Sequence, residues 1–190
     1  TSCLGDAVHQ HVDKEVEDKP GANALACKDA AIRFEDVHFS YNPDRKILKG
    51  VSFEVPAGKT VAVVGPSGAG KSTLTRLMFR FYDVSGGRIT VDGQDIRDVT
   101  QNSLRQEIGI VPQDTVLFNQ SILENIRYGR IDASDEDVLD AIRMAHLEEF
   151  IARLPKGVDT LVGERGLKLS GGEKQRVAIA RTLVKDKAMK

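Results

Sequence analysis

Apolar residues in the first part of the chain form short runs of the kind that build β-strands. Residues 32–41 are rich in β-favouring side chains but break their alternation once, and residues 51–55 alternate cleanly. We therefore expect two strands, the first with a bulge. Residues 60–64 and 108–111 are almost wholly apolar, as in buried parallel strands. Another short strand is expected at residues 88–92.

Helical spacing follows the first apolar run and dominates the second half of the chain. Leu74, Leu77, Met78 and Phe81 recur at i, i+3, i+4 and i+7, which predicts a helix over residues 73–81 with one buried face. Together with the strands, these helices indicate an α/β fold. Further helices, two of them opened by capping-box patterns, are expected at residues 103–107, 121–128 (from Ser121-x-x-Glu124), 134–145 (from Ser134-x-x-Asp137), 147–154 and 171–183.

Size and composition narrow the class of protein. The chain has 190 residues, of which 41% are hydrophobic and 29% charged, as in one globular domain. A net charge of −1 gives no sign of nucleic-acid binding. Cys3 and Cys27 lie far apart, which favours neither a disulfide framework nor a metal site. We expect the polar residues 1–30 to form a linker, and residues 31–190 to form the folded domain.

The strongest chemical signal lies between the run at residues 60–64 and the helix at residues 73–81. It fits the pattern G-x-x-x-x-G-K-[ST]. Glycines let the backbone approach a polyphosphate closely, and the loop amides and the helix N-terminus direct donors at the anion. The lysine adds a full positive charge, and the serine hydroxyl can ligate Mg²⁺. The residues are Gly65, Pro66, Ser67, Gly68, Ala69, Gly70, Lys71 and Ser72.

A second predicted helix that begins with glycines, and could likewise bind an anion at its N-terminus, occurs near the end of the chain. Its serine and glycines suit an anion, although on this stretch alone a plain N-cap explains them equally well. Two phosphate cradles about 100 residues apart fit two different nucleotides, or nucleotides that face the second cradle across a dimer. The residues are Leu169, Ser170, Gly171, Gly172 and Glu173.

Together the two stretches resemble the ATP-binding-cassette (ABC) family. Residues 169–176 resemble its signature motif, Gln113 resembles its Q-loop glutamine, and Tyr41 resembles the aromatic residue that stacks on adenine. Residues 163–166 resemble a loop by which exporters contact their transmembrane domain. The resemblance implies an ABC-type P-loop NTPase, with a mixed sheet around the phosphate-loop helix, a β-subdomain, and a helical subdomain at about residues 115–180.

The resemblance also implies a role for each motif. Residues 65–72 would hold the β- and γ-phosphates of ATP, and Thr73 would hold the α-phosphate. Ser72 and Gln113 would reach Mg²⁺ and the attacking water, which makes Gln113 the catalytic candidate. The signature residues 169–173 would bind the nucleotide of a second copy of the domain, and closure of this head-to-tail dimer would move a transmembrane domain.

Several stretches point to one group within the family. Residues 79–83, 92–97 and 111–119 are most similar to half-transporters of mitochondrial iron–sulfur export and bacterial heavy-metal tolerance. Residues 18–22 resemble the segment between their membrane and ATPase domains. The resemblance implies an exporter domain at the cytoplasmic or matrix face of an inner membrane, with sulfur-containing compounds or metal conjugates as cargo.

The end of the chain departs from the family pattern, which continues with an apolar strand ending in Asp-Glu and a later histidine. Residues 184–190 are mostly charged instead. We therefore expect a C-terminally incomplete domain of a longer protein, which binds ATP but does not hydrolyse it. Two alternatives stay open: an inactive truncated remnant, and a soluble ABC-type ATPase of DNA maintenance. Against the latter, residues 73–168 contain no sustained heptads.

Overall fold

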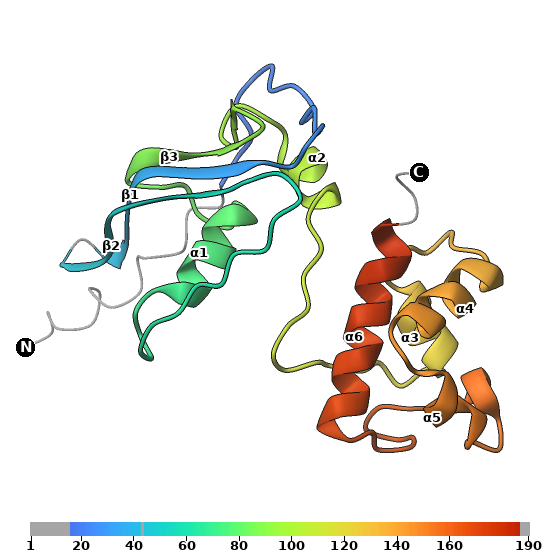
Figure 1. Ribbon diagram of the computed structural model, residues 1–190. Helices are drawn as coiled ribbons and strands as arrows, with labels where there is room; N and C mark the ends of the chain where they lie inside the picture. Colours follow the sequence, from blue (N-terminus) through green and yellow to red (C-terminus); the bar gives the residue numbers. More distant parts are fainter. Residues whose placement is uncertain (1–15, 43, 187–190) are drawn as a thin grey trace, which may run out of the picture. The chain divides into compact units, whose positions relative to one another are not determined.

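The computed structural model describes residues 16–42 and 44–186, which divide into two units at the bond between Ile108 and Gly109 (Figure 1). Residues 1–15 of the predicted linker lie outside the described residues. Within the described part of the chain, no helix combines the length and the apolar character that a membrane span needs. The first unit is an α/β structure and the second is helical.

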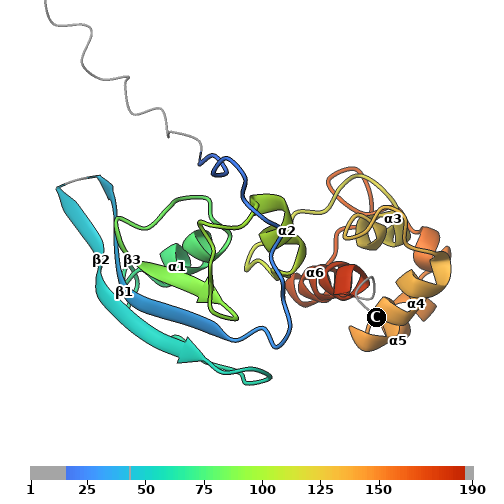
Figure 2. The same cartoon turned by 90° about the horizontal axis from the view of Figure 1, so that it is seen from above.

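The first unit is built on an antiparallel sheet in the order β2-β1-β3-β4 (Figure 2). The strands predicted at residues 32–41, 51–55 and 88–92 are confirmed. The predicted bulge is confirmed as well, because the pairing of β1 with β2 shifts between Phe34 and Val37. The strands are β1 (Ile32–Asn42), β2 (Arg45–Val55), β3 (Gly86–Val91) and β4 (Gln94–Asp95).

Two helices complete the core of the first unit. α1 (Lys71–Met78) contributes Leu77, and α2 (Gln101–Gln106) contributes Leu104; both leucines are fully buried among the side chains of the sheet. The helix predicted at residues 103–107 is thereby confirmed. The views in Figures 1 and 2 both place α1 against the sheet.

The predicted end of α1 is wrong. The i+7 spacing suggested that Phe81 is buried on the helix, but Phe81 is 52% exposed and the helix ends at Met78. Arg80 occupies the buried position instead, at 1% exposure and with a φ of 51°. A residue in this left-handed conformation cannot continue a right-handed helix, so the chain turns here.

Two predicted strands are absent from the described residues. Residues 60–64 and 108–111 form neither helix nor strand. A parallel strand needs neighbouring strands to satisfy its backbone and covering elements on its faces, and the strands described here pair antiparallel with one another instead. The sheet described is therefore antiparallel and not mixed. The side chains left between 41% and 87% exposed are Val61, Val63, Val64, Ile110 and Val111.

The second unit confirms the helices predicted from residue 121 onward. α6 packs against α3 and α4, and their apolar side chains form a core separate from that of the first unit. Ser134 and Asp137 form a reciprocal capping box, and the Ser121 hydroxyl accepts from the N–H of Glu124. The elements are α3 (Ile122–Arg127), α4 (Asp135–Met144), α5 (Glu148–Ala152), the 3-10 turn η1 (Gly157–Asp159) and α6 (Gly171–Asp186).

Several side chains hold residues 16–31, which precede β1, to the first unit, among them a carboxylate and a guanidinium. One is Asp92, which follows β3. Its carboxylate accepts from the backbone N–H groups of Lys28, Asp29, Ala30 and Ala31 over 2.7 to 3.2 Å. These bonds favour the charged form and lower the pKa of Asp92 from 3.8 to about 2.

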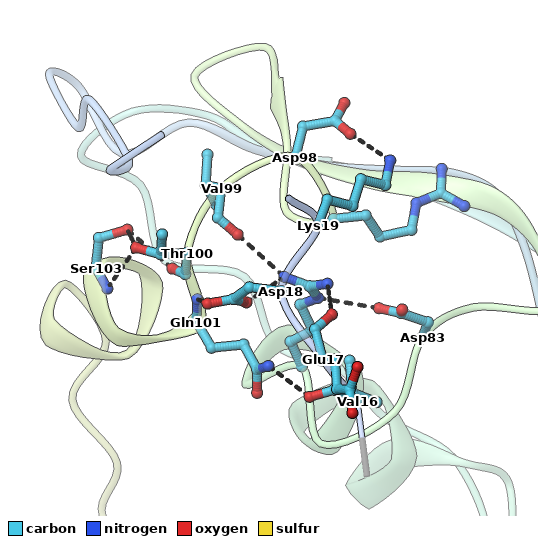
Figure 3. Close-up of polar contacts among 12 residues, drawn as sticks. Val16, Glu17, Asp18, Lys19, Asp83, Asp98, Val99, Thr100, Gln101 and Ser103 are labelled. Atoms are coloured by element: carbon cyan, nitrogen blue, oxygen red, sulfur yellow. Dashed lines mark hydrogen bonds and ion pairs between the residues drawn. The ribbon is translucent and has the colours of Figure 1, made fainter. Parts of the chain in front are cut away.

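The other is the buried Arg80, and Figure 3 labels four residues that its guanidinium contacts, Glu17, Asp18, Asp83 and Val99. It donates to the Asp18 carboxylate over 3.0 Å and to the carbonyl of Glu17 over 3.1 Å. It also donates to the carbonyl of Val99 and to the carboxylate of Asp83. The segment ahead of β1 is therefore tied to the chain that leaves α1.

Candidate functional site

The phosphate-loop pattern forms a turn that leads directly into α1. Gly70 is the N-cap of the helix, with a φ of 88° that favours glycine. A Cβ on Gly70 would also come within 2.9 Å of the Leu48 side chain. Gly68 has a φ of 81° and no atom within 4 Å of an added Cβ position, so space remains open on that side of the loop. Both glycines thus meet a backbone requirement of the loop.

Lys71 is folded back over this loop. Its amino group donates to the carbonyl oxygens of Gly65 and Pro66, over 2.7 and 2.8 Å. A phosphate that enters the loop competes with these neutral carbonyls for the ammonium protons, and charge-assisted hydrogen bonds are the stronger ones. The donors present in the loop and at the start of α1 therefore fit a polyphosphate.

Ser72 and Thr73, the next two residues, differ in environment. Ser72 is exposed in the first turn of α1, where its hydroxyl can serve as a ligand of a hydrated cation. Thr73 is buried, and its hydroxyl lies 3.3 Å from the hydroxyl of Tyr41. No group of three His, Cys, Asp or Glu side chains in the described residues could hold a metal by itself.

Tyr41, at the end of β1, is joined to α1 by two hydroxyl contacts. Besides the contact with Thr73, its oxygen accepts from Nη1 of Arg76 over 3.2 Å. The same bond raises the pKa of the Arg76 guanidinium. Sequence reasoning selected Tyr41 and Thr73 but missed Arg76. The available signal was spacing, because Arg76 lies three residues after Thr73 and thus on the same side of the helix.

The predicted signature residues open α6 in the second unit. The Ser170 hydroxyl accepts from the N–H of Glu173 over 3.3 Å, and the Glu173 carboxylate accepts from the N–H of Ser170 over 2.7 Å. The carboxylate is thereby stabilised, and the pKa of Glu173 is lowered. The N-cap interpretation is therefore confirmed, because these two bonds cap the start of α6 reciprocally.

Glycine at two of the signature positions has no packing reason within the described residues. A Cβ on Gly171 or Gly172 would meet nothing within 4 Å. By contrast, a Cβ on Gly129, in the same unit, would collide with the Arg181 carbonyl. Open backbone at a helix N-terminus suits the close approach of an anion. Leu169, the first residue of the motif, is buried in the core of the unit.

Gln113 is exposed in a segment of the second unit that is neither helix nor strand. The loop at residues 163–166, named from the sequence as a contact of a transmembrane domain, lies in this unit together with the loop at residues 115–119. The Asn119 side chain accepts from the N–H of Arg165, and Gly163 packs against the backbone at Phe118. These loops line a groove of about 660 Å³, whose walls are residues 115–119, 163, 164, 167–169 and 174.

The floor of this groove is supported by two polar residues that sequence reasoning missed. Asn125 is fully buried; it accepts from the N–H of Phe118 and donates to the carbonyls of Phe118 and Ser121. Arg181 of α6 donates to the carbonyl of Asn125 and lies over the rings of Phe118 and Tyr128. Burial lowers the pKa of the Arg181 guanidinium.

Comparison with known proteins identifies the family of this chain. Residues 48–189 match the family described as ABC transporter. The chain belongs to the ABC transporter family. The resemblance drawn from the phosphate loop and the signature is thereby confirmed, as is the ABC-type α/β fold class.

Relatives of this ABC domain include transporters from bacteria and fungi. An ATM1-type heavy metal exporter of Novosphingobium aromaticivorans is 63% identical over 172 residues, which are 90% of this chain and 28% of that protein. The mitochondrial iron-sulfur clusters transporter atm1 of Aspergillus fumigatus is 57% identical over 178 residues, which are 93% of this chain and 24% of that protein. The chain thus spans about a quarter of the length of these relatives.

A solved structure agrees with these relatives. It is a bacterial Atm1-family ABC exporter with ATP bound, and it matches with a TM-score of 0.87 at 63% sequence identity. The match covers 90% of this chain and 30% of the exporter chain. The narrower prediction, similarity to the mitochondrial iron–sulfur and bacterial heavy-metal group, is therefore confirmed.

Proposed function

We propose that this ABC domain binds Mg-ATP and drives export by an Atm1-type transporter. The observation that carries the proposal is the phosphate loop at the start of α1, with left-handed glycines and an adjacent lysine whose protons face carbonyl oxygens. The relatives that share the sequence are transporters, one of them a heavy metal exporter, and one of the matching structures is of an exporter with ATP bound. The parent protein is accordingly an ATPase coupled to transport.

Each residue of the loop has a part in this proposal. The backbone N–H groups of Gly65 and of residues 67–70 and the ammonium of Lys71 bind the β- and γ-phosphates, and Thr73 binds the α-phosphate. Tyr41 stacks on adenine. Ser72 and Gln113 hold Mg²⁺, which when bound neutralises phosphate charge, and Gln113 also orients the attacking water.

The signature residues serve a nucleotide held by another copy of the domain. The Ser170 hydroxyl and the amides of Gly171 and Gly172 bind its γ-phosphate in a head-to-tail dimer. Support comes from the open space around both glycines at the start of α6. ATP is then enclosed between two copies and holds them together.

The groove of the second unit receives the transmembrane domain of the same transporter. Val116 is 73% exposed and Phe118 41% exposed along this groove, so apolar surface is available to a partner. The domain then lies at the cytoplasmic or matrix face of an inner membrane. Sulfur-containing compounds or metal conjugates are the proposed cargo, in keeping with the named relatives.

The soluble alternative is not favoured. The relatives that match about nine tenths of this chain are transporters, which does not fit a soluble ATPase of DNA maintenance. The expectation that this chain binds ATP without hydrolysing it stays a prediction. Release of phosphate from ATP by the isolated chain measures it directly.

The test of the nucleotide site is a titration of the 190-residue chain with Mg-ATP by calorimetry. Loss of a charge-assisted hydrogen bond costs about 1.5–3 kcal/mol, so Lys71→Ala should weaken binding by about 10- to 100-fold. Lys59→Ala is the matched control, because Lys59 is exposed in the preceding turn. This variant should bind ATP with the affinity of the unmodified chain. Equal affinities in the Lys71 and Lys59 variants would overturn the assignment.

A further inference from the structure

Arg76 lies outside the motifs that carry the proposed function, yet it contacts the residue proposed to read the base. It is exposed on α1, and its Nη1 donates to the Tyr41 hydroxyl over 3.2 Å. Its Cζ also lies over the Tyr41 ring, 5.9 Å from the centroid. Arg76 therefore has both a polar and a stacking contact with this tyrosine.

The Tyr41 ring is held from its other sides by aromatic neighbours. Phe39 and Tyr82 contact it edge to face, with centroid distances of 4.8 and 5.2 Å. These contacts restrict the tilt of the ring but do not anchor its hydroxyl end. The anchor comes from α1, through Arg76 and through the Thr73 hydroxyl at 3.3 Å.

The anchoring connects two elements that bind different parts of one ligand. Tyr41 ends β1, whereas Thr73 and Arg76 belong to the helix that begins at the phosphate loop. A ring that is 41% exposed would otherwise have to be ordered when a base stacks on it. Fixing the ring before binding removes that cost, and the gain applies only to ligands that carry a base.

We propose that Arg76 is a positioning residue for base recognition, which sets the Tyr41 ring through a hydrogen bond to its hydroxyl. This inference rests on the proposed function, because it takes the nucleotide site as given. A positioning role for Arg76 predicts different effects on binding than a direct contact between its charge and the phosphates. A cation that acted directly on phosphates would strengthen binding of every polyphosphate, whereas a positioning residue affects only nucleotides.

The experiment compares two ligands, Mg-ATP and Mg-tripolyphosphate, in calorimetric titrations of the full chain. Arg76→Ala and Tyr41→Phe should each weaken ATP binding by about 3- to 10-fold, the range expected for one hydrogen bond. Both should bind tripolyphosphate within about twofold of the unmodified chain. Because both variants remove the same bond, the double variant should lose no more ATP affinity than the single variant that binds ATP more weakly.

Arg33→Ala is the matched control, since Arg33 is also exposed in the first unit and, among the described residues, forms its ion pair with Glu54 on the neighbouring strand. Two results would overturn the proposal. One is an equal loss of ATP and tripolyphosphate affinity in Arg76→Ala, which would make Arg76 a phosphate-binding cation. The other is unchanged ATP affinity. Lys71→Ala separates the positioning role of Arg76 from the nucleotide site on which it rests. Normal ATP affinity in the Lys71→Ala variant would contradict the nucleotide site itself.

Discussion

Nη1 of Arg80 lies 3.0 Å from Oδ1 of Asp18, and this ion pair joins a fully buried guanidinium to a carboxylate that is 36% exposed. Asp18 belongs to the segment ahead of the sheet, and it also accepts from the N–H of Gln101 at the start of α2. Arg80 follows the phosphate-loop helix. The pair therefore fastens the entering segment to both helices of the first unit.

Replacement of Arg80 by methionine tests how much this fastening contributes. Arg80→Met keeps most of the volume but leaves the carbonyls of Val99 and Glu17 without their donor. We expect the free energy of unfolding to fall by about 2–4 kcal/mol, measured by urea denaturation. Arg33→Met, at an exposed position, should change it by less than about 0.5 kcal/mol. Equal effects of the two substitutions would contradict the proposed anchoring.

Asp92 predicts a dependence of stability on pH. Its pKa is about 2 in the folded chain, below the ordinary 3.8, because four backbone N–H groups stabilise the carboxylate. A depressed pKa contributes stability that is present above pH 3.8 and is lost as the pH falls through about 2. The urea midpoint of Asp92→Asn should therefore fall less steeply over this interval than that of the unmodified chain.

The matched control for Asp92 is Asp29→Asn. Asp29 lies in the same anchored segment, but only its backbone N–H contacts Asp92. Its substitution should leave the pH dependence as it is in the unmodified chain. If Asp92→Asn and the unmodified chain lost stability in parallel from pH 4 to pH 2, the role given to Asp92 would be wrong.

Asn125 predicts a defect confined to the second unit. Asn125→Leu leaves the N–H and the carbonyl of Phe118 without their buried partner, next to the groove. We expect a loss of about 1–3 kcal/mol in the stability of that unit, seen as faster amide hydrogen exchange in α3 and α6. Asn102→Leu, at an exposed position of α2, is the control and should leave exchange unchanged. Unchanged exchange in both variants would show that Asn125 does not support the groove.

The local patterns of the sequence were sufficient for much of the fold and of the site. The phosphate loop, the capping box at Ser134 and the bulge in β1 each depend on residues close together in the chain, so spacing predicts them. The strand predictions at residues 60–64 and 108–111 were wrong for the opposite reason. An apolar run becomes a strand only when another strand pairs with it, and its own composition does not supply that partner.

By itself the sequence determined the family, the phosphate-binding loop and the signature helix, because glycine, lysine and serine act there through their own backbone and first-turn geometry. Only the tertiary structure decided which arginines matter. Arg80 reaches Asp18 across 62 positions of the chain, Arg181 reaches Asn125 across 56, and Arg76 reaches Tyr41 across 35. A long guanidinium side chain has the same local pattern on a solvated surface as in a buried network, and only folding brings its partners within hydrogen-bond distance.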